Sequence, residues 1–338
     1  MNHVISAKGL EMHFPGCDAL QGVDLNVKQG TVFALLGENG AGKTTLIRIL
    51  MGYQKASAGS CSVLGLDPVR DELEIRRRVG YVSDAPALYD WMQVGEIGWF
   101  ASAFYPDGFM DRYREAIERY ELPQSRKIKH LSKGQRAKVA LALALAHDPE
   151  LLILDEPTSG LDPLVRREFL ESMIERAATG RTVFLSSHQI AEVERVADEI
   201  AVLHAGKFRI VDSLSELRDS VHKITVSLSD PLITLPQIDG PTELLSEETE
   251  GRQRRFVVRG DAQQVLKLWE GRTGVLQIQA RPATLDELFV ACTRGIPIKL
   301  ESKGKQSTGG TATGETATGE TATGDTTTGD TGTERQAS

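Results

Sequence analysis

The sequence predicts an α/β fold with a mainly parallel sheet, an inserted helical subdomain, a small α+β domain and a disordered tail. Two observations predict the α/β part. Short, largely apolar runs of strand length occur at 32–36, 151–154 and 182–185. A helical pattern of apolar residues follows each run, and such alternation is typical of parallel strands buried between helices. The helices are predicted at about 44–50, 163–177 and 189–197.

A further helical region lies between the first two of these strands. Residues 94–147 are mostly helical in pattern, with the clearest periodicity at 111–120 and 135–146. We therefore expect a helical subdomain at about 85–148, inserted into an α/β domain of residues 1–220.

The pattern changes beyond this domain. Residues from about 222 alternate like half-buried strands or repeat like short helices, which predicts a small α+β domain at 221–300. The strands are expected at 223–228, 255–259 and 275–280, and the helices at 261–270 and 284–293. From 301 to 338 a Thr-Ala-Thr-Gly-Glu repeat lacks large apolar residues, so a disordered tail is predicted.

Composition excludes several classes of protein. The net charge is −8, and half of it lies in residues 306–338, which hold five acidic residues and one arginine. The rest is nearly neutral and has no basic block, so no nucleic-acid partner is expected. No apolar run approaches the length of a membrane helix, and no signal peptide is recognisable. Three widely spaced cysteines, Cys17, Cys61 and Cys292, suit neither a metal site nor a disulfide framework and fit a reducing cytosol.

The strongest motif follows the first predicted strand. It is Gly37-Glu38-Asn39-Gly40-Ala41-Gly42-Lys43-Thr44-Thr45, which matches the phosphate-binding loop of P-loop proteins. The glycines allow tight curvature, so that backbone N–H groups and the following helix N-terminus face phosphate oxygens. Lys43 can reach the β- and γ-phosphates, and the Thr44 hydroxyl can bind Mg²⁺. The alternative is a glycine-rich turn that matches by chance.

A pair of carboxylates marks the end of the second predicted strand. Asp155 and Glu156 follow the apolar run 151–154. Ligands bind at this end of the strands in open parallel sheets. Asp155 can hold Mg²⁺, and Glu156 can act as general base toward an attacking water. The alternative is a buried strand followed by two solvated acids.

Three weaker signals accompany these motifs. Leu131-Ser132-Lys133-Gly134-Gln135 precedes a helix, with Ser132 or Lys133 as its N-cap, and offers a second anion-binding N-terminus. Ser159-Gly160-Leu161-Asp162 follows the acidic pair, and His188 follows the third strand. Alone, the first would be a capped helix, and the histidine a structural one.

Taken in order, these five elements resemble the ATP-binding subunit of an ABC transporter, over most of residues 1–220. The resemblance implies a P-loop NTPase core that binds ATP and Mg²⁺ and hydrolyses ATP. Its implied catalytic residues are Lys43, Glu156 and His188. Its implied metal ligands are Thr44, Asp84 and Asp155. Its implied nucleotide-binding residues are Phe14 under the adenine, Gly37, Glu38, Asn39, Gly40, Ala41, Gly42, Lys43, Thr44 and Thr45 on the phosphates, and Ser132, Gly134 and Gln135 on the γ-phosphate held by the opposite subunit.

Two positions depart from the family pattern. Asp84 stands where the family usually has Gln, and a carboxylate binds Mg²⁺ more strongly but cannot donate a hydrogen bond. Lys133 stands where Gly is commonest, and a cation there is compatible with phosphate binding. Neither change removes the phosphate-loop lysine or the general base, so hydrolysis is still expected.

The resemblance also implies partners. Two copies would clasp two ATP molecules head to tail, with Asp162 in the loop that crosses the interface, and a homodimer is expected. A separate permease would receive the motion, so the chain would be cytoplasmic and peripheral on the inner face of the membrane. Six aromatic residues within 89–105 could form the permease groove or fill the helical core. The resemblance is greatest to bacterial exporters, and an importer is less favoured.

The sequence disfavours most functions other than transport. A soluble ABC ATPase acting on ribosomes would usually carry two cassettes, and one acting in DNA repair would need a longer insertion than residues 45–131 provide. A kinase or GTPase would not explain the motif at 131–135. A regulatory module that binds nucleotide without hydrolysing it stays open, because of Asp84.

Overall fold

The computed structural model describes residues 3–238 and 240–294 of the 338-residue chain. The predicted tail at 301–338 lies outside the described residues. Contacts group residues 1–298 into one compact unit, so the boundary predicted near residue 220 remains a prediction.

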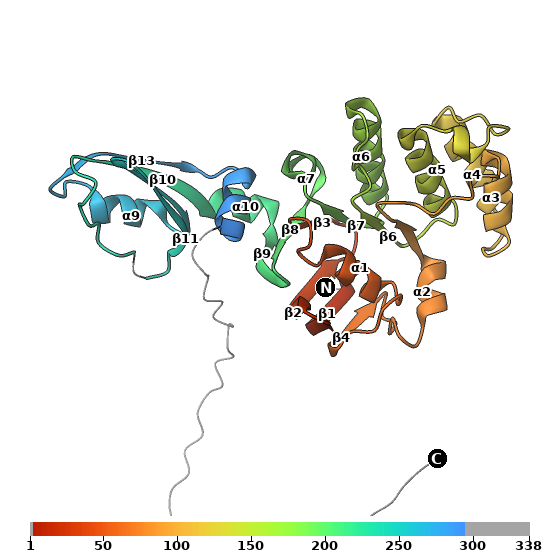
Figure 1. Ribbon diagram of the computed structural model, residues 1–338, viewed down its shortest axis with the longest axis horizontal. Coiled ribbons are helices and arrows are strands. Elements are labelled where there is room, and N and C mark those ends of the chain that lie inside the picture. Colours follow the sequence, from red (N-terminus) through yellow and green to blue (C-terminus); the bar gives the residue numbers. More distant parts are fainter. Residues whose placement is uncertain (1–2, 239, 295–338) are drawn as a thin grey trace, which may run out of the picture. The chain divides into compact units, whose positions relative to one another are not determined.

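A six-stranded sheet forms the centre of the structure (Figure 1), with the strand order β5-β6-β7-β3-β8-β9. All neighbouring pairs are parallel except β8 and β9, which confirms the predicted, mainly parallel sheet. The strands are β3 (Val32–Leu36), β5 (Val79–Val82), β6 (Leu151–Asp155), β7 (Thr182–Ser187), β8 (Glu199–His204) and β9 (Lys207–Ser213). Because the first four of these are parallel, their carboxyl ends meet at one edge of the sheet.

The predicted helices next to this sheet are present within a few residues of their expected bounds. They are α1 (Lys43–Leu50), α6 (Pro163–Ala178) and α7 (Ile190–Val196). An additional helix, α2 (Glu72–Arg78), leads into β5. The apolar faces of these helices pack against buried residues of the strands, as their periodicity indicates.

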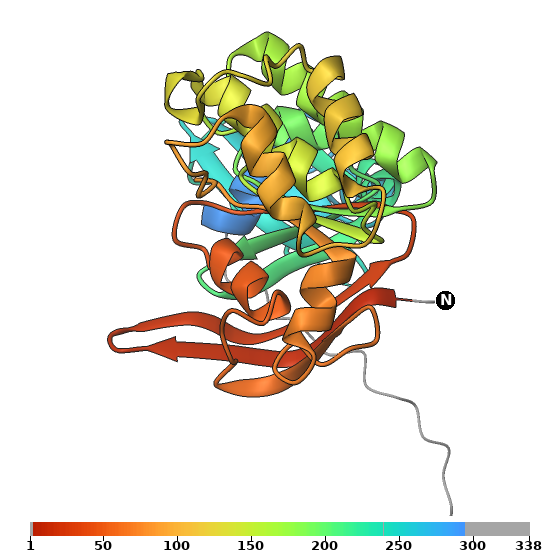
Figure 2. The same cartoon turned by 90° about the vertical axis from the view of Figure 1, so that its right-hand side faces the viewer.

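A second, antiparallel sheet was not predicted. Its strands are β1 (His3–Phe14), β2 (Cys17–Lys28) and β4 (Ala58–Val63), in the order β2-β1-β4, and Figure 2 shows the long β1–β2 hairpin. Register shifts interrupt β1, and two glycines in the hairpin, Gly9 and Gly22, have positive φ angles of 57° and 73°. Such irregularities break the strict alternation by which a strand is recognised.

The helical region contains α3 (Val94–Ser102), α4 (Phe109–Arg119) and α5 (Lys133–Leu145), beside the short helix η1 (Ile128–His130). These helices have an apolar core of their own, in which Tyr113 is fully buried and donates a hydrogen bond to the Val94 carbonyl. A Cβ built on Gly98 would lie 2.1 Å from the Tyr113 ring, so α3 and α4 approach closely.

The remaining residues form a four-stranded antiparallel sheet in the order β11-β12-β10-β13. Helix α8 (Leu214–Ser220) precedes this sheet. Its strands are β10 (Val221–Leu228), β11 (Glu243–Glu250), β12 (Gln253–Arg259) and β13 (Val275–Pro282), and the helices α9 (Ala262–Trp269) and α10 (Leu285–Arg294) flank β13 in the sequence. Among the described residues 221–238 and 240–294, β11 is the one element that was missed, because its second half is continuously polar. Helix α10 shares an apolar core with the central sheet, in which Leu285 and Leu288 join Ala34 and Val193.

No helix within 3–238 and 240–294 has both the length and the apolar character needed to cross a membrane.

Candidate functional site

The phosphate-binding loop lies where the sequence predicts it, between β3 and α1. Helix α1 begins at Lys43 with Gly42 as its N-cap, at a φ of 110°. A Cβ built on Gly42 would lie 2.4 Å from the Ala19 carbonyl oxygen, and one built on Gly37 would lie 2.6 Å from the Leu203 carbonyl oxygen. Both glycines are therefore required by the close passage of the loop against β2 and β8.

Replacing Gly42 by Ala is expected to destabilise the protein more than replacing Gly65 by Ala. Gly65 has a φ of 78° but no atom within 4 Å of a built Cβ, so its variant bears only the backbone cost of about 1–2 kcal/mol. At Gly42 the Ala19 carbonyl must also move. Urea unfolding of the two variants measures the difference. Equal free energies of unfolding would show that the close contact carries no cost.

Lys43 is almost completely buried and turns back over the loop. Its Nζ donates hydrogen bonds to the carbonyl oxygens of Gly37, at 2.6 Å, and Glu38, at 3.2 Å. The same Nζ lies 3.0 Å from Oε1 of Glu156. The structure thus brings together the lysine and the acid, which are far apart in the sequence.

The acidic pair is held by the end of the neighbouring strand β7. The β6–β7 register places Asp155 opposite Ser186. The Ser186 hydroxyl donates to Oδ1 of the buried Asp155 at 2.6 Å and accepts from the Glu156 backbone N–H at 3.0 Å. His188 follows the same strand, and its Nδ1 lies 2.7 Å from Oε2 of Glu156. Glu156 is therefore held between an ammonium and an imidazole.

The backbone of Glu156 is in an unusual conformation. Its φ of 49° is in the left-handed region, which costs a non-glycine residue about 1–3 kcal/mol and is typical of functional sites. The turn at this residue directs the carboxylate toward Lys43 and His188 instead of along the strand. Sequence reasoning placed Glu156 correctly but missed Ser186, although a Ser-Ser-His run at the end of a buried strand was a usable signal.

The oxygen donors at this edge fit Mg²⁺. Thr44 is exposed in the first turn of α1. One carboxylate oxygen of Asp155, Oδ1, accepts the hydrogen bond from the Ser186 hydroxyl. Asp84 is exposed two residues beyond β5, and the register of Val82 with Leu154 places it along the same edge. In the described part of the chain, no group of three or more His, Cys, Asp or Glu side chains converges on one point. Mg²⁺ commonly takes one or two protein oxygens together with waters and phosphate oxygens, and Thr44, Asp155 and Asp84 are the donors that would hold it here.

The second predicted anion site lies at the start of α5. Ser132 is the N-cap, and it forms a capping box with Gln135: the Gln135 N–H donates to Ser132 Oγ at 3.2 Å, and the Ser132 N–H donates to Gln135 Oε1 at 3.1 Å. A Cβ built on Gly134 would lie 3.3 Å from Val165 of α6. Asp162 is the N-cap of α6 and accepts from the Val165 N–H at 3.1 Å.

These contacts divide the predicted residues into two groups. One group surrounds Lys43 and Glu156, whereas the other lies where α5 meets the N-terminus of α6. Phe14 belongs to neither contact network; it ends β1 at the tip of the hairpin and is 40% exposed.

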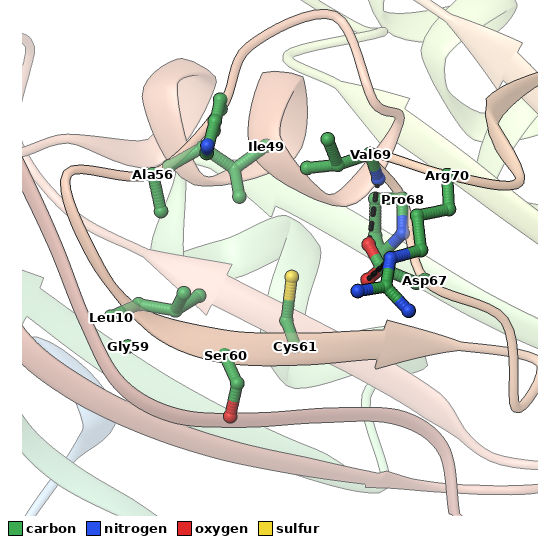
Figure 3. Close-up of a pocket in the computed structure, with 11 residues that line it drawn as sticks. Leu10, Ile49, Ala56, Gly59, Ser60, Cys61, Asp67, Pro68, Val69 and Arg70 are labelled. Atoms are coloured by element: carbon green, nitrogen blue, oxygen red, sulfur yellow. Dashed lines mark hydrogen bonds and ion pairs between the residues drawn. The ribbon is translucent and has the colours of Figure 1, made fainter.

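Cavities also lie outside these groups, among them one at β4 and one at β5. Figure 3 shows the first, of about 270 Å³, where the Cys61 thiol on β4 points toward Ile49. Burial raises the pKa of this thiol to about 11, so it stays protonated and unreactive at neutral pH.

The second cavity, of about 400 Å³, is a groove lined mainly by apolar residues of β5, α3, α5 and the loop after β5, including Tyr81, Leu88, Ala101 and Leu143. Five aromatic residues of the same segments, here called the aromatic cluster, are exposed: Tyr89, Trp91, Trp99, Phe100 and Phe104. Four of these rings contact one another in the order Trp91, Tyr89, Phe100 and Phe104, with centroids 5.6–6.1 Å apart, and Trp99 is exposed on the same helix as Phe100. Tyr105, the sixth aromatic residue, is instead stacked on Phe109 and His147. The cluster is thus exposed on the surface, while Tyr105 is half-buried and lines the groove.

Comparison with known proteins links this site to one family. The family model described as ABC transporter matches residues 20–159. The chain is 32% identical to the daunorubicin resistance ATP-binding protein DrrA3 of Streptomyces coeruleorubidus, over 86% of this chain and 95% of that protein. It is 30% identical to the bacitracin transport ATP-binding protein BcrA of Bacillus licheniformis, over 87% of this chain and 99% of that protein. By contrast, it spans 62% of the length of an uncharacterised ABC transporter ATP-binding protein of Nostoc, at 38% identity.

Solved structures give the same result. An ATP-binding subunit of an ABC transporter superposes with a TM-score of 0.60 at 31% identity, over 64% of this chain and 92% of that one. A dimeric ATP-binding cassette in a post-hydrolysis state, bound to ADP and phosphate, superposes with a TM-score of 0.57 at 25% identity, over 62% of this chain and 98% of that one.

Proposed function

Because this chain belongs to the ABC transporter ATP-binding proteins, a family of ATPases, we propose that it hydrolyses ATP as one of two subunits that drive export through a separate membrane permease. One observation carries the proposal. Lys43, from the loop after β3, and His188, after β7, hold opposite oxygens of the Glu156 carboxylate. A buried carboxylate between two donors, at the ligand-binding edge of a parallel sheet, suits a general base beside a phosphate site.

The residues around Glu156 have distinct roles in this scheme. The backbone N–H groups of residues 37–45 and the N-terminus of α1 would hold the phosphates. The Lys43 ammonium would neutralise the β- and γ-phosphate oxygens, and Glu156 would take a proton from the attacking water. His188 would orient the Glu156 carboxylate through Nδ1 and contact the γ-phosphate through Nε2; both contacts are donations only when both ring nitrogens carry a proton. Ser186 fixes the backbone of Glu156 and the carboxylate of Asp155 relative to each other through the two hydrogen bonds of its hydroxyl.

A magnesium ion, when bound, would neutralise charge on the phosphate oxygens. Thr44 and Asp155 would hold it, and Asp84 would act on it directly or through water. Asp155 keeps one oxygen for this task because Ser186 donates only to the other.

The division of the site into two groups supports a dimer. Ser132, Gly134 and Gln135 lie at the start of α5, which packs against α3, α4 and β5, and not beside Lys43. In the proposed dimer these residues would contact the γ-phosphate bound by the other copy, and Phe14 would stack on adenine. The similar dimeric cassette with ADP and phosphate supports this arrangement. A homodimer is the simplest form, since one chain carries both groups.

Export is supported by the relatives that match over nearly their whole length. DrrA3 is named for daunorubicin resistance and BcrA for bacitracin transport. These matches cover 86% and 87% of this chain. Residues 1–220 alone would make up a smaller share, so both matches extend into the region of the four-stranded sheet. The permease would hold the chain at the cytoplasmic face of the membrane. The nearly neutral body gives no electrostatic support for a nucleic-acid partner.

The groove and the aromatic cluster are the proposed permease contact. Exposed apolar patches of this kind mark protein interfaces, and aromatic residues are common anchors in them. Within the groove, burial lowers the pKa of His147 to about 4, so its imidazole is neutral at physiological pH and the groove gains no charge from it. A cytoplasmic helix of a permease with apolar residues on one face fits this surface.

Replacing Trp91 and Trp99 by Ala is expected to weaken permease association at least tenfold while leaving the ATPase rate of the isolated chain unchanged. These side chains are 66% and 71% exposed, and neither takes part in the contacts of Lys43, Glu156 and His188 described above. The measurement is retention of a polytopic membrane protein by the tagged chain from detergent-solubilised membranes. Leu276→Ala, which removes an equally exposed side chain on β13, is the control. Full retention by the double variant would contradict the proposed contact, and absence of any membrane protein from the wild-type preparation would contradict the transport function.

A further inference from the structure

Glu192 on α7 is a charged residue that the proposed reaction does not use, yet it is only 4% exposed. Its Oε2 accepts hydrogen bonds from the hydroxyl groups of Thr158, at 2.7 Å, and Ser187, at 3.3 Å. Its Oε1 forms an ion pair with Arg166 Nε at 3.1 Å. Both hydroxyl partners are also buried, at 1% exposure each. One carboxylate therefore connects three segments of the chain.

The positions of these partners relate Glu192 to the catalytic group. Thr158 lies two residues after Glu156, and Ser187 immediately precedes His188. The Gln189 N–H also donates to Ser187 Oγ, at 2.9 Å, so this hydroxyl sets the turn that carries the histidine. Glu192 thus holds the two turns from which Glu156 and His188 project.

Arg166 extends the connection to the second group of site residues. Its Nη2 donates to the Leu161 carbonyl at 3.1 Å, next to Asp162, which caps α6. Val165 of the same helix turn packs on Gly134 at the start of α5. A continuous set of contacts therefore runs from Glu192 through the turn at 158–162 to the residues that would meet the other copy's nucleotide.

A role in stability alone does not account for this arrangement. Burying an ion pair costs about as much in desolvation as its attraction returns, and apolar residues of similar size often stabilise as well or better. A buried carboxylate whose partners lie in the turn after Glu156, at the end of β7 and in the first turns of α6 instead defines the geometry of these segments.

We propose that Glu192 is a positioning residue for ATP hydrolysis: it sets the relative placement of Glu156 and His188 through Thr158 and Ser187, and that of the 158–162 turn through Arg166. This inference rests on the proposed ATPase function. The partners of Glu192 are Thr158, Ser187 and Arg166, none of which belongs to the loop at 37–45, so its loss should act on the catalytic step and not on ATP binding.

The first test compares Glu192→Ala with Glu171→Gln in the full-length chain. Glu171 forms an exposed ion pair with Arg167 on the same helix as Arg166 and connects to no turn of the site. Displacement of catalytic groups by about 1 Å can cost about 100-fold in rate. We expect kcat per nucleotide-binding molecule to fall about 10- to 100-fold in Glu192→Ala, with KM for ATP unchanged within about threefold, and neither to change in Glu171→Gln.

A purely structural role would reduce the amount of folded protein but leave kcat per binding-competent molecule unchanged, and that result would overturn the proposal. If Glu192→Ala does not fold, Thr158 provides the second test, because its replacement removes a single hydrogen bond. Thr158→Val should lower kcat, and Thr158→Ser, which keeps the hydroxyl, should restore it. Equal kcat values for these two variants would also overturn the proposal.

A combined variant tests whether Glu192 acts through Thr158. If it does, Glu192→Ala with Thr158→Val should lower kcat no further than Glu192→Ala alone, whereas multiplicative losses would contradict the connection. Glu156→Gln, measured in parallel, separates the two proposals. Normal hydrolysis by Glu156→Gln would overturn the proposed function. Loss of hydrolysis in Glu156→Gln together with full kcat in Glu192→Ala would overturn only the role of Glu192.

Discussion

Replacing Glu156 by Gln is expected to lower the rate of ATP hydrolysis by about 100- to 10,000-fold, the usual contribution of a general base, while ATP still binds. The amide is nearly the same size as the carboxylate but cannot accept the proton of the attacking water. The Lys43 and His188 contacts lie on the two oxygens of the carboxylate, so the substitution changes the chemistry more than the packing.

The measurement is phosphate release at saturating Mg-ATP, together with nucleotide affinity from equilibrium binding. Glu175→Gln is the control, because Glu175 forms an exposed ion pair with Arg119 away from the site. The Glu156 variant should also accumulate as a dimer in the presence of Mg-ATP, which light scattering detects. Wild-type turnover would refute the assignment of the base, and a monomeric variant at saturating ATP would refute the two-copy arrangement.

Replacing Lys43 by Ala is expected to weaken ATP binding by about 10- to 150-fold, which corresponds to the loss of a charge-assisted hydrogen bond worth about 1.5–3 kcal/mol. The substitution also leaves the Glu156 carboxylate, only 13% exposed, without its nearest cation. That uncompensated charge would repel the phosphates, so the loss should lie toward the upper end of the range.

Equilibrium binding of a fluorescent ATP analogue measures this loss. Lys207→Ala, which removes an exposed lysine on β9, is the matched control for a general change in charge. ADP binding should be weakened less than ATP binding, because fewer phosphate oxygens lie near the missing ammonium. Unchanged affinity for both nucleotides would show that Lys43 serves only to close the loop through the Gly37 and Glu38 carbonyls.

Much of the site could be predicted because its members follow strand ends. A parallel sheet brings the residues after β3, β6 and β7 to one edge, so Lys43, Glu156 and His188 could be expected to meet without knowledge of their contacts. The helix beginning near Gly42 and the N-cap at Ser132 were also predictable, since caps depend on local residue types.

The contributions of Ser186 and Glu192 were not predictable in the same way. Ser186 matters because the β6–β7 register places it opposite Asp155, and a sequence pattern does not specify register to a single residue. A charged residue in a short amphipathic helix is ordinarily solvent-exposed, and only the packing of α6 against α7 shows that Glu192 is enclosed.

The aromatic segment could not be resolved from the sequence either. Helical spacing is the same for rings that fill a core and rings that face a partner. The structure shows that Trp91 and Trp99 are exposed while Tyr105 is half-buried. The β1–β2 hairpin was missed for a different reason, since the irregularities near Gly9 and Gly22 interrupt its alternation.

The core shared by α10, β3 and α7 limits how this protein can be shortened. Leu285, Leu288 and Val257 cover Ala34 of the strand that leads into the phosphate loop and Val193 of the helix that carries Glu192. A chain truncated after residue 220 would expose the apolar surface around Ala34 and Val193 to water. This surface belongs to the strand that leads into the phosphate loop and to the helix that carries Glu192. Such a fragment is expected to aggregate, because the last quarter of the described chain, residues 221–238 and 240–294, supplies the cover of this apolar surface.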